Sequence, residues 1–242
     1  MATKYWEGDI SGDITDADNW DADTLPSNDD TIIFSDNTAT FTDLEGDLSG
    51  ITGLAMIVGN LWDGNFGDET VACTFDLASL EYSGQGREVY IDCDTTDLPI
   101  TVADTGGGDN ALSIGGTADI TTLRVIDGKG TISNRTSRTI TTIEVIGASN
   151  VTLDLATVPS TGTTLRMDSG TVKIADSHTN IFVSGGLLEI TGEPTAISTV
   201  DIYDGKVNFN VSGTSAAITT SLSIYDGEFS ATDITASVAT IT

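Results

Sequence analysis

Histidine occurs once in the 242-residue chain, at His178, and lysine and arginine together number only nine. A single histidine argues against Ser-His-Asp, Cys-His and multi-histidine metal sites, and we interpret His178 as a turn residue in the segment ADSHTN. The nine basic residues face 37 acidic ones, so the formal net charge is −28. Such a surface repels phosphate, which excludes duplex DNA or RNA as a direct ligand.

Long apolar runs are also missing. No stretch approaches the roughly 18 apolar residues that span a bilayer, so we expect no membrane segment. The N-terminus, MATKYWEGDISGD, has one lysine and no apolar run, and we therefore expect no secretory signal. These absences favour a protein that folds and assembles inside a cell.

The sequence is rich in one pattern, a repeat of about twenty residues that carries an apolar-alternating strand broken at a glycine. Clear copies are TLRVIDGKGTIS, TLRMDSGTVKI, NIFVSGGLLEI, VDIYDGKVNFNV and LSIYDGEFSA. The break recurs about once per repeat, at Gly128, Gly147, Gly170, Gly186, Gly205 and Gly227. Self-similarity at this period predicts an all-β, right-handed parallel β-helix, a solenoid with about 20 residues per rung and about ten rungs.

In-register stacking of the repeat predicts ladders of side chains on the rungs. IYDGKVNF and IYDGEFSA recur one repeat apart, which places Tyr203 over Tyr225 and Val207 over Phe229. Arg124 and Arg166 share one position in the motif and are expected in a lateral ladder.

The two cysteines, Cys73 and Cys93, are separated by the length of one repeat. Equivalent positions on successive rungs lie about 4.8 Å apart. A disulfide could bridge that separation if the side chains point the same way. A stacked pair of buried, reduced thiols is the alternative that intracellular folding favours. Neither arrangement makes the cysteines catalytic.

We divide the chain into a capping and docking segment, residues 1–35, and the β-helix rungs, residues 36–242. The first segment is dense in aspartate and holds two of the three tryptophans. A β-helix needs a cap over its open end, and Trp6 and Trp20 are expected to cover the first rung. The C-terminal SVATIT is strand-like without a polar cap, which suggests shielding by assembly.

Calcium is the one cofactor to consider, since DITDADNWDAD (residues 13–23) and DGNFGDE (residues 63–69) are rich in oxygen ligands. Neither has the spacing of an EF-hand loop or the nonapeptide calcium repeat. We interpret both as solvated acidic loops and expect no cofactor.

A glycoside hydrolase would need two carboxylates placed across a glycosidic bond. A chain this rich in aspartate contains such pairs by chance, so they are weak evidence for an enzyme. We therefore favour a non-enzymatic protein.

The segment YWEGDISGDITDADNWDADTLPSNDDTIIF resembles the opening of autotransporter-type passenger repeats and of phage β-helical structural proteins. The matching residues are Trp6, Gly8, Asn19, Trp20, Pro26, Asp29 or Asp30, and Phe34. The resemblance implies architecture first. Because no export signal is expected, the resemblance points to the phage structural proteins of this group, which are assembled into the virion in the host cytoplasm.

From these observations we expect a non-enzymatic virion structural protein, a phage capsid decoration or cement protein that forms a homotrimer. Capsid proteins are its expected partners, docking near Trp6, Asn19, Trp20 and Pro26, where irregular loops offer a unique surface. A tail-fibre or receptor-binding module is a second hypothesis, with a glycan groove and exposed aromatics such as Trp62, Tyr203 or Tyr225. A polysaccharide-degrading β-helix enzyme or a bacterial surface adhesin would share the same fold.

Overall fold

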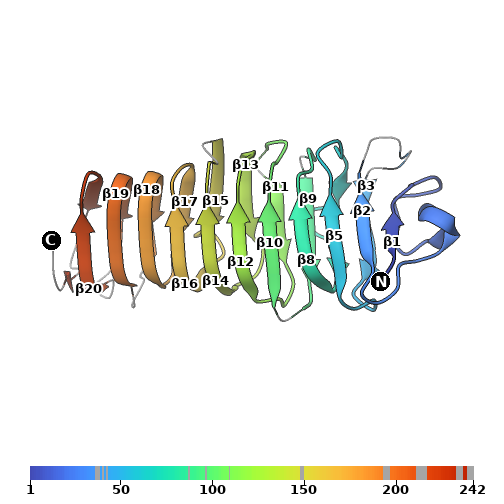
Figure 1. Ribbon diagram of the computed structural model, residues 1–242, viewed down its shortest axis with the longest axis horizontal. Helices are drawn as coiled ribbons and strands as arrows, with labels where there is room; N and C mark the ends of the chain where they lie inside the picture. The colour runs from blue at the N-terminus through green and yellow to red at the C-terminus, as the bar shows by residue number, and fades with distance from the viewer. Residues whose placement is uncertain are drawn as a thin grey trace.

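Parallel strands wind around one axis and stack into an elongated rod, with the residues of the N-terminus at one end (Figure 1). The computed structural model describes residues 1–35, 39, 41, 43–86, 88–95, 97–108, 110–147, 150–192, 197–210, 217–232 and 237–238. The predicted all-β parallel solenoid is confirmed, with about nine turns of about 21 residues. Its right-handed winding stays a prediction.

One row of strands forms the front of the rod in Figure 1, each strand pairing in parallel with the equivalent strand of the next turn. Its members are β1 (Thr3–Tyr5), β2 (Thr31–Phe34), β5 (Leu54–Val58), β8 (Leu77–Tyr82), β10 (Leu98–Val102), β12 (Ile120–Val125), β14 (Arg138–Val145), β16 (Ser160–Met167), the first halves of β18 (His178–Ile190) and β19 (Ile197–Asn210), and β20 (Ala217–Ile224). β22 (Ser237–Val238) pairs with β20.

The remaining strands form the other walls of the tube. They are β3 (Asp43–Leu44), β4 (Asp47–Leu48), β6 (Asn65–Phe66), β7 (Cys73–Phe75), β9 (Glu88–Cys93), β11 (Asn110–Gly115), β13 (Lys129–Asn134), β15 (Asn150–Leu155), β17 (Thr171–Ile174), the second halves of β18 and β19, and β21 (Glu228–Thr232). The helices of the described residues are two short 3-10 turns, Ala17–Asn19 and Asp21–Asp23, and none is long and apolar enough to span a membrane.

The core is a stack of apolar ladders, because alternate side chains of every strand point into the tube. The clearest ladder runs through the front row and is buried at each rung. It consists of Ile32, Met56, Leu80, Ile100, Leu123, Ile143, Leu165, Ile181, Val200 and Leu222. Each rung thus buries its apolar face only by stacking on its neighbours.

Outward-facing ladders alternate in charge. Arg124 pairs in register with Glu144, which in turn pairs with Arg166, and the Arg124 Nε lies 3.8 Å from a Glu144 carboxylate oxygen. Lys206 over Glu228 repeats the scheme at 2.9 Å. Parallel stacking would otherwise set like charges on adjacent rungs, which destabilises a sheet. The predicted Arg124–Arg166 ladder is therefore real but interrupted by a glutamate.

Glycine is required at the corner that follows the front strands. Gly186 and Gly205 both have positive φ angles, +76° and +83°. A Cβ added to Gly186 would lie 2.6 Å from the Gly170 carbonyl oxygen, and one on Gly205 would lie 2.7 Å from the Gly185 carbonyl carbon. Stacked corners approach too closely for any side chain, which is why the repeat breaks at glycine.

The cysteines are free thiols, and they are not stacked on one another. Cys73 pairs in register with Ile91, whereas Cys93 pairs with Phe75. The expectation of a stacked pair was wrong because the step between these two rungs, from Cys73 to Ile91, is shorter than the spacing of the cysteines. Both thiols are fully buried, and burial raises the pKa of each to about 12.

Native Cys73 and Cys93 are expected to resist alkylation at neutral pH. At neutral pH a thiol with a pKa of about 12 holds about a thousandfold less thiolate, the reactive form, than a thiol with the ordinary pKa of 9.0. Mass spectrometry after iodoacetamide treatment should show no adducts in the folded protein and two adducts in urea. A single adduct in urea without reductant, or none, would contradict the free-thiol assignment.

Candidate functional site

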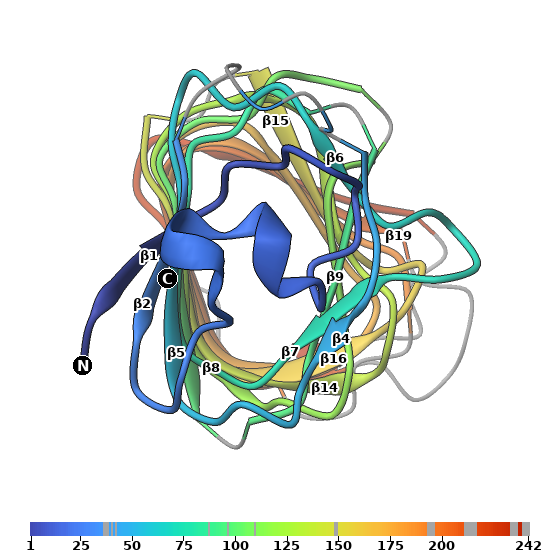
Figure 2. The same ribbon diagram turned by 90° about the vertical axis from the view of Figure 1, so that its right-hand side faces the viewer.

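An aromatic cluster seals the N-terminal end of the core. The rings of Trp6 and Trp20 meet edge to face with centroids 5.3 Å apart, and both pack on Phe34 of β2, at 6.0 and 5.8 Å. Phe34 continues the cluster to Trp62 and Phe66. The Trp20 indole nitrogen donates to the Ile14 carbonyl oxygen at 2.9 Å. Figure 2 shows the first residues of the chain lying across this end of the tube.

Asn19 holds the cap loops together from a fully buried position. Its Oδ1 accepts hydrogen bonds from the backbone nitrogens of Ile10 and Ser11, both at 3.0 Å. Its Nδ2 donates to the Ser11 hydroxyl and the Asp13 carbonyl oxygen, at 2.9 and 3.1 Å. All four hydrogen-bonding positions of the amide are used inside the protein.

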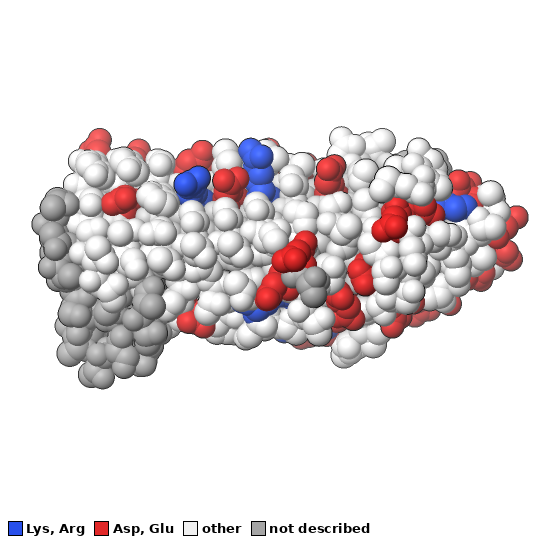
Figure 3. Space-filling model, turned by 60° about the horizontal axis from the view of Figure 1, so that its bottom comes forward, with Lys and Arg blue, Asp and Glu red and all other residues white. Residues whose placement is uncertain are grey.

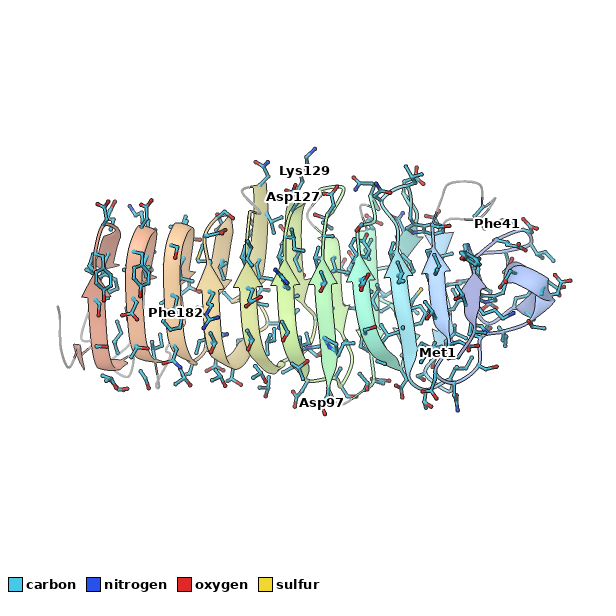
Figure 4. All side chains as sticks on the ribbon, viewed as in Figure 1. Met1, Phe41, Asp97, Asp127, Lys129 and Phe182 are labelled. Atoms are coloured by element: carbon cyan, nitrogen blue, oxygen red, sulfur yellow. The ribbon has the colours of Figure 1, made fainter. Side chains whose placement is uncertain are left out.

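The four residues expected at a docking surface are therefore interior residues. Pro26 is buried like Trp6, Asn19 and Trp20, so none of the four side chains is open to a partner. Besides the terminal Met1, the exposed apolar side chains at this end include Tyr5, Ile10 and Phe41, exposed by 47, 54 and 39%. Phe41 lies at the cap end of the rod in Figure 4, and its backbone nitrogen donates to the carbonyl oxygen of Gly8. A partner at this end would meet these three side chains.

A groove of about 360 Å³ lies on the lateral face over β14, β16 and β18. Its charged lining residues are Glu144, Arg166 and Asp168, and Phe182 and Ser184 complete the side toward the C-terminus. The Arg166 guanidinium lies over the Phe182 ring, 5.4 Å from its centroid. Figure 4 shows Phe182 on the front row of strands. We call this feature the lateral groove.

Two stacked tyrosines continue the same face toward the C-terminus. The rings of Tyr203 and Tyr225 are 4.8 Å apart and nearly parallel, which confirms the predicted ladder. Both are exposed, by 46 and 66%. Trp62, the third aromatic residue expected at the surface, is wholly buried beside Phe34 and Phe66, so that expectation was wrong. The predicted pair of Val207 and Phe229 is also in register.

A second groove, of about 400 Å³, is acidic. Its lining includes Asp43, Glu45, Asp68 and Glu88. It overlaps the second stretch considered for calcium, but Asp68 Oδ1 already accepts hydrogen bonds from the Thr70 backbone and hydroxyl and from the Val71 backbone. The Thr70 hydroxyl and these backbone donors lower the pKa of Asp68. This carboxylate therefore closes its own turn.

The first acidic stretch behaves in the same way. Asp13 accepts from the Thr15 backbone and hydroxyl, Asp16 caps the first 3-10 turn, and Asp21 accepts from the Tyr5 backbone. Among the described residues, no group of three or more His, Cys, Asp or Glu side chains is arranged to hold a metal ion. Figure 3 shows acidic side chains over this end of the rod, with few basic ones.

His178 lies inside the tube, and its interpretation as a turn residue was wrong. It begins β18 in register with Gly162, and a Cβ on that glycine would lie 2.8 Å from the imidazole Cδ2. The missing side chain of Gly162 thus makes the room that the imidazole fills. Both ring nitrogens are buried, and burial lowers the pKa of His178 to about 4, against a smaller opposite effect of the backbone and charge of Asp176.

The lateral groove is the surface that sequence reasoning did not identify. Its signal is visible in retrospect, because the third residue of the copies TLRV, TIEV, TLRM and NIFV is in turn Arg124, Glu144, Arg166 and Phe182. Compared at this one position, successive copies of the motif carry charged residues and then an aromatic residue.

No family model, no curated protein and no solved structure matches the chain.

Proposed function

We propose that this protein is a non-enzymatic structural component of a virus particle, a decoration or cement protein on a phage capsid. The observation that carries the proposal is the unbroken ladder from Ile32 to Leu222, closed at its first rung by Trp6 and Trp20. Such a rod is stiff because each turn is fixed by the next. The resemblance of the segment from Tyr5 to Phe34 to phage β-helical proteins supports the same role.

We propose that the capped end of the rod binds the capsid proteins. Tyr5, Ile10 and Phe41 are exposed there, next to loops fixed by Asn19. Irregular loops with exposed apolar groups offer a surface that no rung repeats, and apolar and aromatic anchors dominate the energy of interfaces. The rest of the acidic rod would face solvent, where its charge keeps neighbouring copies soluble.

The location of the chain tests this role directly. Particles from cells that express it would be separated on a density gradient, probed by mass spectrometry and labelled with an antibody for electron microscopy. Label over the capsid is the expected result. Label confined to the tail or to the cell envelope, or a chain absent from the particle band, would overturn the proposal.

We further propose a homotrimer in solution, formed without bound calcium. Light scattering should give three times the mass of one chain, and a chelator should leave that mass unchanged, because Asp13 and Asp68 already accept hydrogen bonds within their own turns. A monomer would contradict the trimer. A trimer that dissociates with chelator would show that calcium holds it together.

The second candidate is a tail-fibre or receptor-binding module. Its support is the lateral groove, with the exposed pair Tyr203 and Tyr225 beside it. Antibody label at the tail, together with a ligand for that groove, would favour this candidate over the capsid role.

A further inference from the structure

The geometry points to a saccharide site on the lateral groove. We propose that it binds an elongated, uncharged oligosaccharide that lies along the rod across β14, β16 and β18 and reaches Tyr203 and Tyr225. The proposal concerns the isolated chain and does not depend on attachment to a capsid.

Arg166 provides the donors. Among the residues that the structure describes, its guanidinium forms no ion pair and donates no hydrogen bond, and the side chain is exposed in the groove. This is unusual on a chain with 37 acidic residues, most of all for an arginine next to Glu144 in its ladder. Stacking on Phe182 holds the guanidinium in place and leaves its N–H groups free for the hydroxyl oxygens of a ligand.

Glu144 and Asp168 provide the acceptors on either side of that arginine. Asp168 is held by the Gly147 backbone nitrogen and the Ser169 hydroxyl, at 2.8 and 2.9 Å from its Oδ1. The Glu144 side chain is largely packed against its neighbours and only 26% exposed. Fixed acceptors beside a fixed donor suit a ligand that both donates and accepts, as a sugar hydroxyl does.

The shape and charge of the surface favour an elongated and uncharged ligand. The groove crosses three rungs, about 4.8 Å apart, so its occupant must be elongated along the rod axis. Its volume of about 360 Å³ lies within the usual range for small-molecule sites. Phe182, Tyr203 and Tyr225 offer apolar ring surface, which suits the C–H faces of sugar rings, and the two tyrosines add a hydroxyl group. The net charge of −28 disfavours an anionic polymer.

Calorimetric titration of the full chain would test this with four neutral hexasaccharides, of the malto, cello, xylo and chito series, and with hexagalacturonate as the anionic comparator. We expect at least one neutral chain to bind with a Kd below about 1 mM and hexagalacturonate to bind more weakly. R166M should weaken binding about tenfold or more, the usual effect of losing a charged hydrogen bond. Y225A should weaken it several-fold.

R124M is the matched control, since Arg124 belongs to the same outward ladder but lies outside the groove. It should bind nearly like the parent chain, because Arg124 is about half exposed and its 3.8 Å contact with Glu144 is long, so its loss should move the packed Glu144 side chain little. All three variants should keep the parent's urea midpoint. Three results would each overturn the proposal: no binding of any neutral hexasaccharide, equal losses in R166M and R124M, or tighter binding of hexagalacturonate. A change in solution mass in R166M alone would overturn it too, and would assign the groove to contact between copies.

Discussion

Replacing Trp20 by alanine is expected to lower the free energy of unfolding by about 3–5 kcal/mol, the usual range for a buried Trp or Phe truncated to alanine. The side chain is fully buried, it packs against Trp6 and Phe34, and its indole nitrogen satisfies the Ile14 carbonyl oxygen. Its loss would open a cavity over the first rung and leave that oxygen without its donor. Urea unfolding followed by circular dichroism measures the change.

Tyr5→Ala supplies the control for this prediction, because Tyr5 lies in the same segment but is about half exposed. It should cost less than about 1 kcal/mol. If W20A does not fold, W20F keeps the test open, since it should still unfold at lower urea than the parent. Equal midpoints for W20A and Y5A would show that the cluster does not hold the cap.

A second large effect is expected from acid. The pKa of His178 is about 4 in the folded protein, below the ordinary histidine value of 6.5, because burial disfavours the imidazolium. Above pH 6.5 the residue is neutral in both states and adds no pH dependence. Between pH 6.5 and about 4 the unfolded chain takes up a proton that the folded chain does not, so stability falls by about 3 kcal/mol in total.

His178→Leu should remove this slope. Urea midpoints at pH 7, 5.5 and 4.5 would fall for the parent chain and stay level for H178L. The window isolates the effect because the chain has no other histidine, and the stability that Asp30, Asp47 and Asp68 gain from their lowered pKa values is lost mainly as the pH falls through and below the ordinary value of 3.8. An equal slope in both proteins would show that His178 is not the titrating group.

The structural features that could be predicted from the sequence are those that recur with the repeat. Alternation of apolar residues and the recurring glycine determined the parallel solenoid, because a strand with period 2 and a corner without space for Cβ permit few other arrangements. The tyrosine ladder followed from the same logic, since IYDG recurs unchanged in two neighbouring rungs.

Single residues were harder to place, because the step between rungs is not constant. Cys73 and Cys93 are one average repeat apart, yet the shorter local step, which pairs Cys73 with Ile91, moves them out of register. Trp62 lies in a loop segment but turns inward to complete the aromatic cluster around Phe34. Neither the register of the cysteines nor the inward orientation of Trp62 can be recognised from the residues near them in the sequence.

Periodicity and composition were thus enough to predict the parallel solenoid and the strongly acidic character of the chain. Tertiary structure alone decided that His178 fills the space left by Gly162, and that Glu144, Arg166 and Phe182 meet in one groove. The physical reason is register. Side chains about one repeat apart in the sequence become neighbours only if their strands pair in that register, and the packing of each turn's core sets the register.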